Sequence, residues 1–306
     1  MGRARRARAD GRPAAGAVRP PARTDDHVRT VSPMTTSNPA APERLEIDGA
    51  PATAEQLRAR ALDSFGHFTA MQVRGGAVRG LALHIDRLDA ATRELFDQGL
   101  DGERVRAAIR HALAADGSGR EPLRDAAVRV YVHAPDGEPS LMVTVRPPVE
   151  LPATMAGRAQ SLKSVPYVRP VAHIKHLGGF GQVYHRREAA RLGYDEALLT
   201  GPDGAISEGA VTNVAFFDGR EVVWPEAPHL GGITMRLLEP LLADAGLPTR
   251  RGPVFLRDLP AYRAAFVTNS WGVSPVRRVD DQDFPLDERL MATVADLYEG
   301  APRDVI

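Results

Sequence analysis

From Arg44 onward the sequence alternates short strand-like segments with amphipathic helices, and Gly- or Pro-containing turns separate them. The predicted strands of the first part are residues 65–74, 77–83, 126–132 and 140–145. Its predicted helices are residues 84–96 and 102–115, where apolar side chains recur near a 3.6-residue period. The Gly75-Gly76 pair predicts a hairpin between the first two strands. Strands, helices and strands in this order indicate an α+β domain.

The second half opens on the Gly-rich segment 175–181 (KHLGGFG) and continues with helices and short strands. Its predicted helices are residues 182–192, which Gly193 can end, and residues 234–245. A further strand and loop are predicted over residues 268–276. We therefore predict a small α/β domain over residues 44–165, a linker over 166–172 and a larger domain over 173–306.

Residues 1–43 consist mainly of Arg, Ala, Pro and Thr, with almost no large apolar side chains. Such a segment cannot bury enough apolar surface to offset the entropy of ordering, so we predict a disordered tail. Met34 lies inside it, and whether translation starts at Met1 or at Met34 stays open.

Composition removes several classes of function. Lys+Arg and Asp+Glu number 39 each, so the chain offers no field of one sign to attract nucleic acid. No apolar run approaches the roughly 20 residues of a membrane helix, and neither nucleic acid nor a membrane is an expected partner. The chain has no Cys, which excludes disulfides and cysteine-ligated metal and makes the cytoplasm the expected compartment.

Lysine is rare in this sequence. Of the 39 basic residues only Lys163 and Lys175 are lysines, so arginine serves wherever positive charge alone is needed. A guanidinium stays protonated, whereas an ε-amine with a lowered pKa can form an imine with an aldehyde. Lys175, beside flexible glycines, is therefore a candidate reactive amine.

Other polar residues of the chain suit a cofactor that an amine would hold. Pyridoxal phosphate needs an amine for its aldehyde, a carboxylate at its pyridine nitrogen and a donor-rich phosphate site. Glu208 lies beside glycine at a strand end, and residues 231–234 lead into a helix for which Thr234 is the predicted N-cap. The start of a helix attracts an anion. Residues 268–270 and Arg87 could add phosphate donors.

Four motifs together resemble those of one enzyme family. They are HIDRL at 84–88, the Lys175 segment with its helix ending in RLGYDEA at 191–197, SEG at 207–209 before Thr212-Asn213, and GIT at 232–234. They have the order and similar spacing of the class IV (fold type IV) pyridoxal-phosphate-dependent aminotransferases. That family includes D-amino-acid and branched-chain aminotransferases and aminodeoxychorismate lyase. The resemblance covers about residues 44–280.

The resemblance implies a role for each matching residue. Lys175 is the lysine that holds pyridoxal 5'-phosphate as a Schiff base, and Glu208 is the partner of the pyridine nitrogen. The phosphate-binding residues that it implies are Arg87, Ile233, Thr234, Asn269 and Ser270. It also implies a fold with a small N-terminal α/β domain beside a larger C-terminal pseudo-barrel domain. A homodimer is expected, in which the partner chain completes the substrate pocket.

Two departures leave the substrate open. Branched-chain aminotransferases usually have a tyrosine five residues after the lysine, where this chain has Phe180. The loop 133–138 lacks the arginines that D-amino-acid aminotransferases and the lyase use near this place for a substrate carboxylate. Segments 175–177 and 68–69 are more similar to the lyase and D-amino-acid branch.

The expected activity is transfer of an amino group between an amino acid or amine and a keto acid through a Lys175 aldimine. One alternative is a lyase that eliminates pyruvate from aminodeoxychorismate. Another is a homologue that only binds the cofactor or a partner. His173 and His176 flank Lys175, but no third ligand follows in the pattern, so no metal site is expected.

Overall fold

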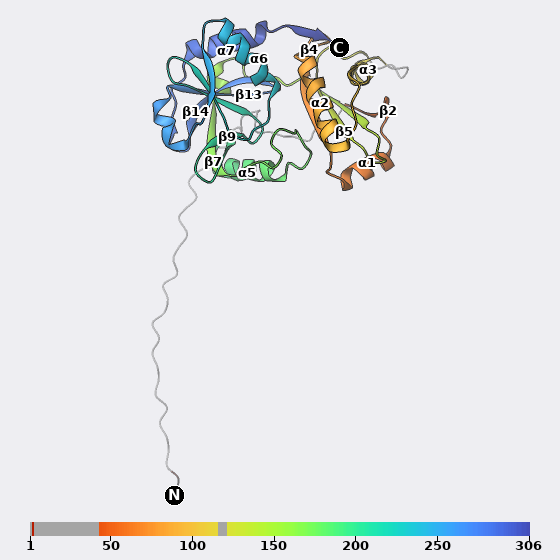
Figure 1. Cartoon of the computed structure of the whole chain (residues 1–306), viewed down its shortest axis with the longest axis horizontal. Helices are drawn as coiled ribbons and strands as arrows, with labels where there is room; N and C mark the ends of the chain where they lie inside the picture. Colours follow the sequence, from red (N-terminus) through yellow and green to blue (C-terminus); the bar gives the residue numbers. More distant parts are fainter. Residues whose placement is uncertain (1, 3–42, 116–120) are drawn as a thin grey trace. The chain divides into compact units, whose positions relative to one another are not determined.

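The computed structural model describes residues 2, 43–115 and 121–306 of the chain. The predicted disordered tail lies outside the described residues except for Gly2 and Glu43. The described part contains a five-stranded sheet, a nine-stranded sheet and a pair of short strands (Figure 1).

The five-stranded sheet is antiparallel throughout and has the order β2-β1-β6-β5-β3. Its strands are β1 (Arg44–Ile47), β2 (Ala50–Pro51), β3 (His67–Val73), β5 (Ala126–His133) and β6 (Ser140–Arg146). The helices of this region are α1 (Ala54–Leu62), α2 (Leu81–Phe96) and α3 (Gly102–Leu113). Every second residue of β3 is buried, as expected for a strand with one face on a core. That core joins Met71 and Val128 of the sheet to Leu88 and Ile109 of the helices.

The local predictions for this region are mostly confirmed. Both predicted helices are present, with α2 beginning three residues earlier than expected, and β5 pairs with β6 as predicted. The Gly75-Gly76 turn forms with positive φ angles of 62° and 78°. The strand predicted over 77–83 was wrong in its extent, and its predicted pairing with the preceding strand is limited to one bridge between Arg74 and Ala77. Only β4 (Ala77–Arg79) is strand, and it pairs with β16 (Arg303–Val305) at the end of the chain.

The nine-stranded sheet has the order β12-β11-β10-β13-β14-β7-β8-β9, and β15 pairs with β14. Its strands are β7 (Gln160–Pro166), β8 (Glu196–Thr200), β9 (Ile206–Gly209), β10 (Asn213–Phe217), β11 (Val222–Pro225), β12 (Thr249–Gly252), β13 (Ala264–Asn269), β14 (Gly272–Val279) and β15 (Gln282–Asp283). The helices around it are α4 (Met155–Arg158), α5 (Phe180–Arg191), α6 (Ile233–Asp244), the 3-10 helix η1 (Leu256–Ala261) and α7 (Glu288–Gly300).

Side chains on the two faces of this sheet enter different cores. Val214 and Phe216 of β10 pack in one apolar cluster, whereas Ala215 between them packs in another with Leu238 of α6 and Val294 of α7. Figure 1 shows α6 and α7 together on the outer side of this sheet. Helices beside antiparallel and mixed sheets confirm the predicted α+β class.

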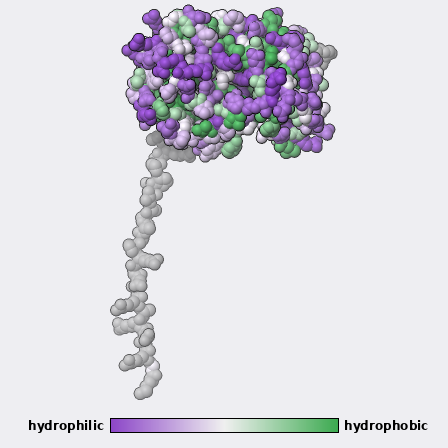
Figure 2. All heavy atoms as spheres, viewed as in Figure 1, coloured by the Kyte–Doolittle hydropathy of each residue, from purple (hydrophilic) through white to green (hydrophobic). Residues whose placement is uncertain are grey.

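The chain passes from the five-stranded sheet to the nine-stranded sheet between Arg146 and Gln160. Strand β7, which falls almost entirely within the range predicted for the small domain, pairs in parallel with β8 and β14 of the nine-stranded sheet. The division into domains at 165 and 172 stays a prediction. No helix among residues 43–115 and 121–306 is long and apolar enough to cross a bilayer. Figure 2 shows a face on which hydrophilic residues predominate and apolar ones are scattered.

The end of the chain caps the helix α2. Asp304 in β16 accepts a hydrogen bond from the backbone N–H of Leu81 at 2.8 Å, and Gly80 before it has no side chain to do so. A side-chain oxygen at a helix start satisfies an amide that lacks a partner within the helix. Strand β16 thus ties the first turn of α2 to the C-terminus.

Replacing Asp304 by alanine is expected to lower the free energy of unfolding by about 1 kcal/mol, because the Leu81 amide loses its acceptor. Urea denaturation followed by circular dichroism measures this change. Asp296→Ala, which removes an exposed carboxylate from α7, is the matched control and should change the same quantity by less than about 0.5 kcal/mol. Equal effects of the two changes would contradict the capping role.

Candidate active site

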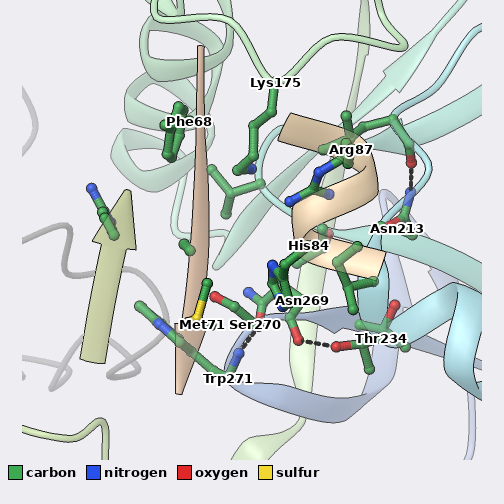
Figure 3. Close-up of a pocket in the computed structure, with 18 of the residues that line it drawn as sticks. Phe68, Met71, His84, Arg87, Lys175, Asn213, Thr234, Asn269, Ser270 and Trp271 are labelled. Atoms are coloured by element: carbon green, nitrogen blue, oxygen red, sulfur yellow. Dashed lines mark hydrogen bonds between the residues drawn. The ribbon is translucent and has the colours of Figure 1, made fainter. Parts of the chain in front are cut away.

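A cavity of about 420 Å³ lies between elements of the two large sheets. This volume is in the range of small-molecule and cofactor sites. Strands β3 and β5 and helix α2 line it from one side, and α5, β9 and the start of α6 from the other. All the predicted site residues line this one cavity: Arg87, Lys175, Glu208, Ile233, Thr234, Asn269 and Ser270. Figure 3 shows Lys175, Arg87, Thr234 and Asn269 around it.

Backbone contacts with the first sheet fix the position of Lys175. The Lys175 carbonyl accepts a hydrogen bond from Phe68 N at 2.9 Å, and Leu177 N donates to Gly66 O at 2.9 Å. The segment around the lysine thus lies beside the start of β3 and is hydrogen-bonded to it. The Lys175 Nζ atom lies 4.9 Å from the centre of the Phe68 ring. The described residues provide no carboxylate within ion-pair distance of it.

The environment of Lys175 favours the neutral amine. Burial lowers its pKa from 10.5 to about 7, the positive charges of Arg87 and Arg169 add to this, and Glu208 opposes it. An amine with a pKa near neutrality is a nucleophile and a base at physiological pH. The other lysine is different: Lys163 forms an ion pair with Asp280 at 2.8 Å, and this hydrogen bond raises its pKa.

Glu208 is a buried carboxylate near the end of β9. Its Oε2 accepts a hydrogen bond from Leu230 N at 3.1 Å, and its Oε1 lies 3.5 Å from Nη1 of Arg169. Burial raises the pKa of Glu208, whereas Arg169 and the Leu230 amide act in the opposite direction. Arg169 is itself buried and donates to Ile174 O at 2.6 Å.

The sequence interpretation missed Arg169. It lies in the segment 166–172, which the pattern predicted as a linker because of its prolines. A lone arginine in a Pro-rich connector carries no local sign of burial. In the structure its guanidinium joins the backbone before Lys175 to the Glu208 carboxylate, and so it couples two of the predicted site residues.

Arg87 enters the cavity from α2. Its Nη2 donates to Thr69 Oγ1 at 2.6 Å and its Nη1 donates to Gly231 O at 3.3 Å, while its Nε is buried without a partner. Burial lowers the pKa of Arg87 to about 10, and Arg236 and Arg169 contribute. A buried cation with neutral partners and cationic neighbours is an attractive position for an anion.

The start of α6 provides a second group of anion donors. The helix begins at Ile233 with Gly232 as its N-cap, and no side chain caps it. The predicted N-cap role of Thr234 is therefore wrong, because Thr234 is already helical and its Oγ1 donates to Asn269 O at 2.7 Å. A Cβ on Gly232 would lie 1.9 Å from Asn213 Oδ1, so only glycine fits there. The first amides of α6 are free of side-chain acceptors.

The turn between β13 and β14 closes this end of the cavity. Asn269 Oδ1 accepts a hydrogen bond from Trp271 N at 2.8 Å, which stabilises the turn. Ser270 lies between them and lines the cavity. Arg87, the first residues of α6 and this turn therefore surround one end of the cavity with donors. Their roles toward a phosphate stay predictions.

Two further residues that the sequence interpretation missed lie on β5. Arg129 and Tyr131 both line the cavity, although an alternating strand offers no sign of which face meets a ligand. The Arg129 guanidinium carbon is 5.9 Å from the centre of the Phe68 ring, and the Phe68 and Tyr131 rings stack at 5.4 Å. Phe180 behaves differently, since it is 81% exposed and does not line the cavity.

The histidines beside Lys175 contact groups outside the cavity's predicted site residues. His173 Nε2 lies 2.9 Å from a Glu94 carboxylate oxygen at the surface, and His176 Nε2 lies 3.0 Å from Pro170 O. No cluster of three or more His, Cys, Asp or Glu side chains suited to a metal ion occurs within residues 43–115 and 121–306.

Comparison with known proteins gives consistent results. A probable branched-chain-amino-acid aminotransferase of Synechocystis sp. is 28% identical over 122 residues, which are 38% of this chain and 40% of that protein. The aligned segment thus spans less than half of that curated relative. The branched-chain aminotransferase structure from Thermoproteus uzoniensis superposes with a TM-score of 0.72 at 19% identity, over 85% of this chain and 94% of that one.

The 4-amino-4-deoxychorismate lyase structure from Pseudomonas aeruginosa superposes with a TM-score of 0.70 at 23% identity, over 84% of this chain and 98% of that one. At these identities the two structures establish the fold. The sequence model of the family described as amino-transferase class IV matches residues 66–279, which hold the cavity residues from Phe68 to Trp271. The chain therefore belongs to the class IV aminotransferase family.

Proposed function

We propose that this protein is a pyridoxal-phosphate-dependent aminotransferase that moves an amino group between an amino acid or amine and a keto acid. One observation carries the proposal: one cavity is lined by an amine whose pKa is about 7, a buried carboxylate and a donor-rich anion site. Family membership supports it.

The residues of the cavity fit this cofactor in three ways. Arg87, with a buried Nε that has no partner, and the uncapped start of α6 suit a phosphate. The Lys175 amine suits the aldehyde carbon, and the Glu208 carboxylate suits a protonated pyridine nitrogen. Among the described lining residues, the arginines, lysine and carboxylate are Arg79, Arg87, Arg129, Arg169, Lys175, Arg186 and Glu208.

The bound cofactor supplies an electron sink for the carbanion that forms when the substrate Cα loses its proton. Lys175 would hold the cofactor covalently through its Nζ atom. The Lys175 Nζ would be the base that takes the substrate Cα proton and the acid that gives it back. Glu208 would retain a proton on the pyridine nitrogen, and Arg169 and the Leu230 amide favour its charged form against the effect of burial. Asn269 and Ser270 hold the phosphate from the side of the β13–β14 turn.

Arg129 is the proposed partner of a substrate carboxylate. It lines the cavity from β5, and its Nη1 donates a long hydrogen bond of 3.5 Å to Tyr131 Oη. Within the described residues no carboxylate pairs with it. Arg129 and Lys175 both lie near the Phe68 ring, with the guanidinium carbon 5.9 Å and the Nζ atom 4.9 Å from its centre. Arg129 thus performs the task for which the loop 133–138 offers no arginine.

Arg129→Leu is expected to raise KM for the keto acid about 10- to 100-fold, since a hydrogen bond to a charged group contributes about 1.5–3 kcal/mol. A smaller change in kcat should accompany it, because the carboxylate is bound in the ground state as well. Steady-state kinetics measure both constants. Arg104→Leu, which removes an arginine paired with Asp48 at the surface, is the control. A KM equal to that of the control would exclude Arg129 from substrate binding.

The proposed assembly is a homodimer. Three apolar side chains of α5 are exposed: Phe180, Val183 and Tyr184, at 81%, 47% and 49%. Val183 also lines the cavity, so this surface adjoins its rim, where a second copy would complete the substrate pocket. Exposed apolar groups of this size suit a protein interface. The proposed compartment is the cytoplasm, which rests on the composition.

Half-reactions test the function. Holoprotein is mixed with L-amino acids, D-amino acids and simple amines in turn, and the keto or aldehyde product is quantified. An aminotransferase releases about one product per bound cofactor and turns over only when a keto acid is added, the ping-pong pattern. Pyruvate and p-aminobenzoate formed from aminodeoxychorismate without a keto acid would identify a lyase instead, as for the structural neighbour. Bound cofactor without any product would identify a non-catalytic homologue.

A further inference from the structure

The imidazole of His84 occupies the same end of the cavity as Arg87. His84 precedes Arg87 by three residues on α2, so both side chains lie on one face of the helix. His84 is 4% exposed and lines the cavity. Figure 3 shows both side chains extending from this helix into the cavity. The function proposed above gives His84 no role.

Hydrogen bonding determines which nitrogen of His84 carries the proton. Thr69 Oγ1 is 2.6 Å from His84 Nδ1 and accepts a hydrogen bond from Arg87 Nη2, also at 2.6 Å. Arginine can only donate, and the threonine hydroxyl has one proton. The acceptor that the structure offers to this proton is Nδ1. With the Thr69 hydroxyl proton assigned to this contact, His84 Nδ1 is unprotonated and Nε2 carries the hydrogen.

The charge of His84 is fixed as well. Burial, with Arg87 and Lys175 nearby, keeps the pKa of His84 well below its ordinary value of 6.5. The imidazole is therefore neutral, with Nε2–H as a permanent donor. Thr69 is completely buried, so water cannot replace it as the partner of Nδ1.

Within the described residues the His84 ring forms its hydrogen bond with Thr69, and the Nε2–H group has no acceptor. Donors inside folded proteins almost always have an acceptor, and the open space beside His84 is the cavity that it lines. The neighbouring groups at this end are Arg87 and the amides at the start of α6, which also donate. A ligand with several acceptor oxygens satisfies all of them.

We infer that His84 is a further phosphate ligand, which donates Nε2–H to a phosphate oxygen of the cofactor while Thr69 holds its tautomer. The inference rests on the function proposed above. Because Thr69 contacts both Arg87 and His84, it aligns two donors on one anion. A neutral donor also adds a hydrogen bond without another positive charge beside Arg87 and Lys175.

Binding of pyridoxal phosphate and of pyridoxal, which lacks the phosphate, tests the inference. Both dissociation constants are measured by equilibrium dialysis with apoprotein. His84→Leu is expected to raise the dissociation constant of pyridoxal phosphate about 10- to 100-fold and to change that of pyridoxal less than about twofold. His84→Gln, whose amide nitrogen can replace Nε2–H, should recover most of the affinity. Thr69→Val removes the hydroxyl that fixes the tautomer of His84, and it should cause an intermediate loss of affinity for pyridoxal phosphate. His173→Leu removes an exposed imidazole and is the control.

If His84→Leu weakened the binding of pyridoxal phosphate and of pyridoxal equally, the inference would be overturned and His84 would be a structural residue only. The same conclusion would follow if His84→Gln failed to recover affinity while its melting temperature matched that of the original protein. Failure of the proposed function gives a different pattern, in which the unaltered protein itself binds neither compound tightly.

Discussion

Replacing Lys175 by arginine is expected to reduce aminotransferase turnover by about 10⁴-fold or more, whereas Lys163→Arg leaves turnover within about twofold. Lys175 has two tasks in the proposed reaction, covalent attachment of the cofactor and transfer of the Cα proton. General acid–base catalysis alone contributes about 10²- to 10⁴-fold. Arginine keeps the positive charge but stays protonated, so it performs neither task.

The two lysines provide a matched pair for this test, because the chain contains no others. Lys163 forms an ion pair with Asp280, which arginine can preserve, and it lies outside the cavity. Turnover is measured with the best amino donor of the half-reaction panel, and melting temperatures verify that both variants fold. If Lys175→Arg retained a tenth of the original turnover, Lys175 would not be the reactive amine.

Glu208→Gln is expected to reduce turnover by about 10²- to 10³-fold, the size of effect seen when one preorganised electrostatic partner is removed. The amide can still accept the Leu230 N–H bond but no longer retains a proton on the pyridine nitrogen. It also leaves the buried Arg169 guanidinium without its counter-charge, at a cost in stability of about 3–5 kcal/mol.

A double variant separates the two effects of Glu208. Arg169→Met with Glu208→Gln removes both buried charges, so much of the free energy of unfolding should return while turnover stays low. Denaturant titration and steady-state kinetics on the three variants measure the two quantities. Recovery of turnover together with stability would mean that Glu208 only balances the charge of Arg169.

Local patterns predicted much of the first region because its helices and its central strand pair form from neighbouring residues. The 3.6-residue period of α2 and the turn between β5 and β6 are both short-range signals. The partner of β4 could not be predicted in this way. Strand β16 lies more than 200 residues further along the chain, and nothing in its three exposed residues indicates the pairing.

In the candidate site, too, local signals could be predicted and contacts that depend on the fold could not. Lys175 and Glu208 were found because a rare lysine and a carboxylate beside glycine are visible in the sequence itself. Arg169 and Arg129 were missed because their importance comes from the neighbours that the fold gives them. The chain has 39 basic residues, of which 37 are arginines, so a single arginine does not stand out in the sequence. Only burial beside Glu208 or projection into the cavity distinguishes these two.

The start of α6 illustrates a smaller limit. A threonine before an apolar run predicts an N-cap, but Gly232 precedes the helix here because Asn213 Oδ1 occupies the space of a side chain. That contact comes from β10, about 20 residues earlier, and is invisible to a local pattern. Its consequence favours function, since an uncapped helix start leaves amides free for an anion.

Reductive trapping tests the central claim most directly. Holoprotein is treated with borohydride, which converts the lysine–cofactor bond into a stable amine, and peptides are then mapped by mass spectrometry. The account predicts that the phosphopyridoxyl group is on the peptide containing Lys175 and that the Lys163 peptide is unmodified. Modification of Lys163, or of neither lysine in a protein that carries the cofactor, would contradict it.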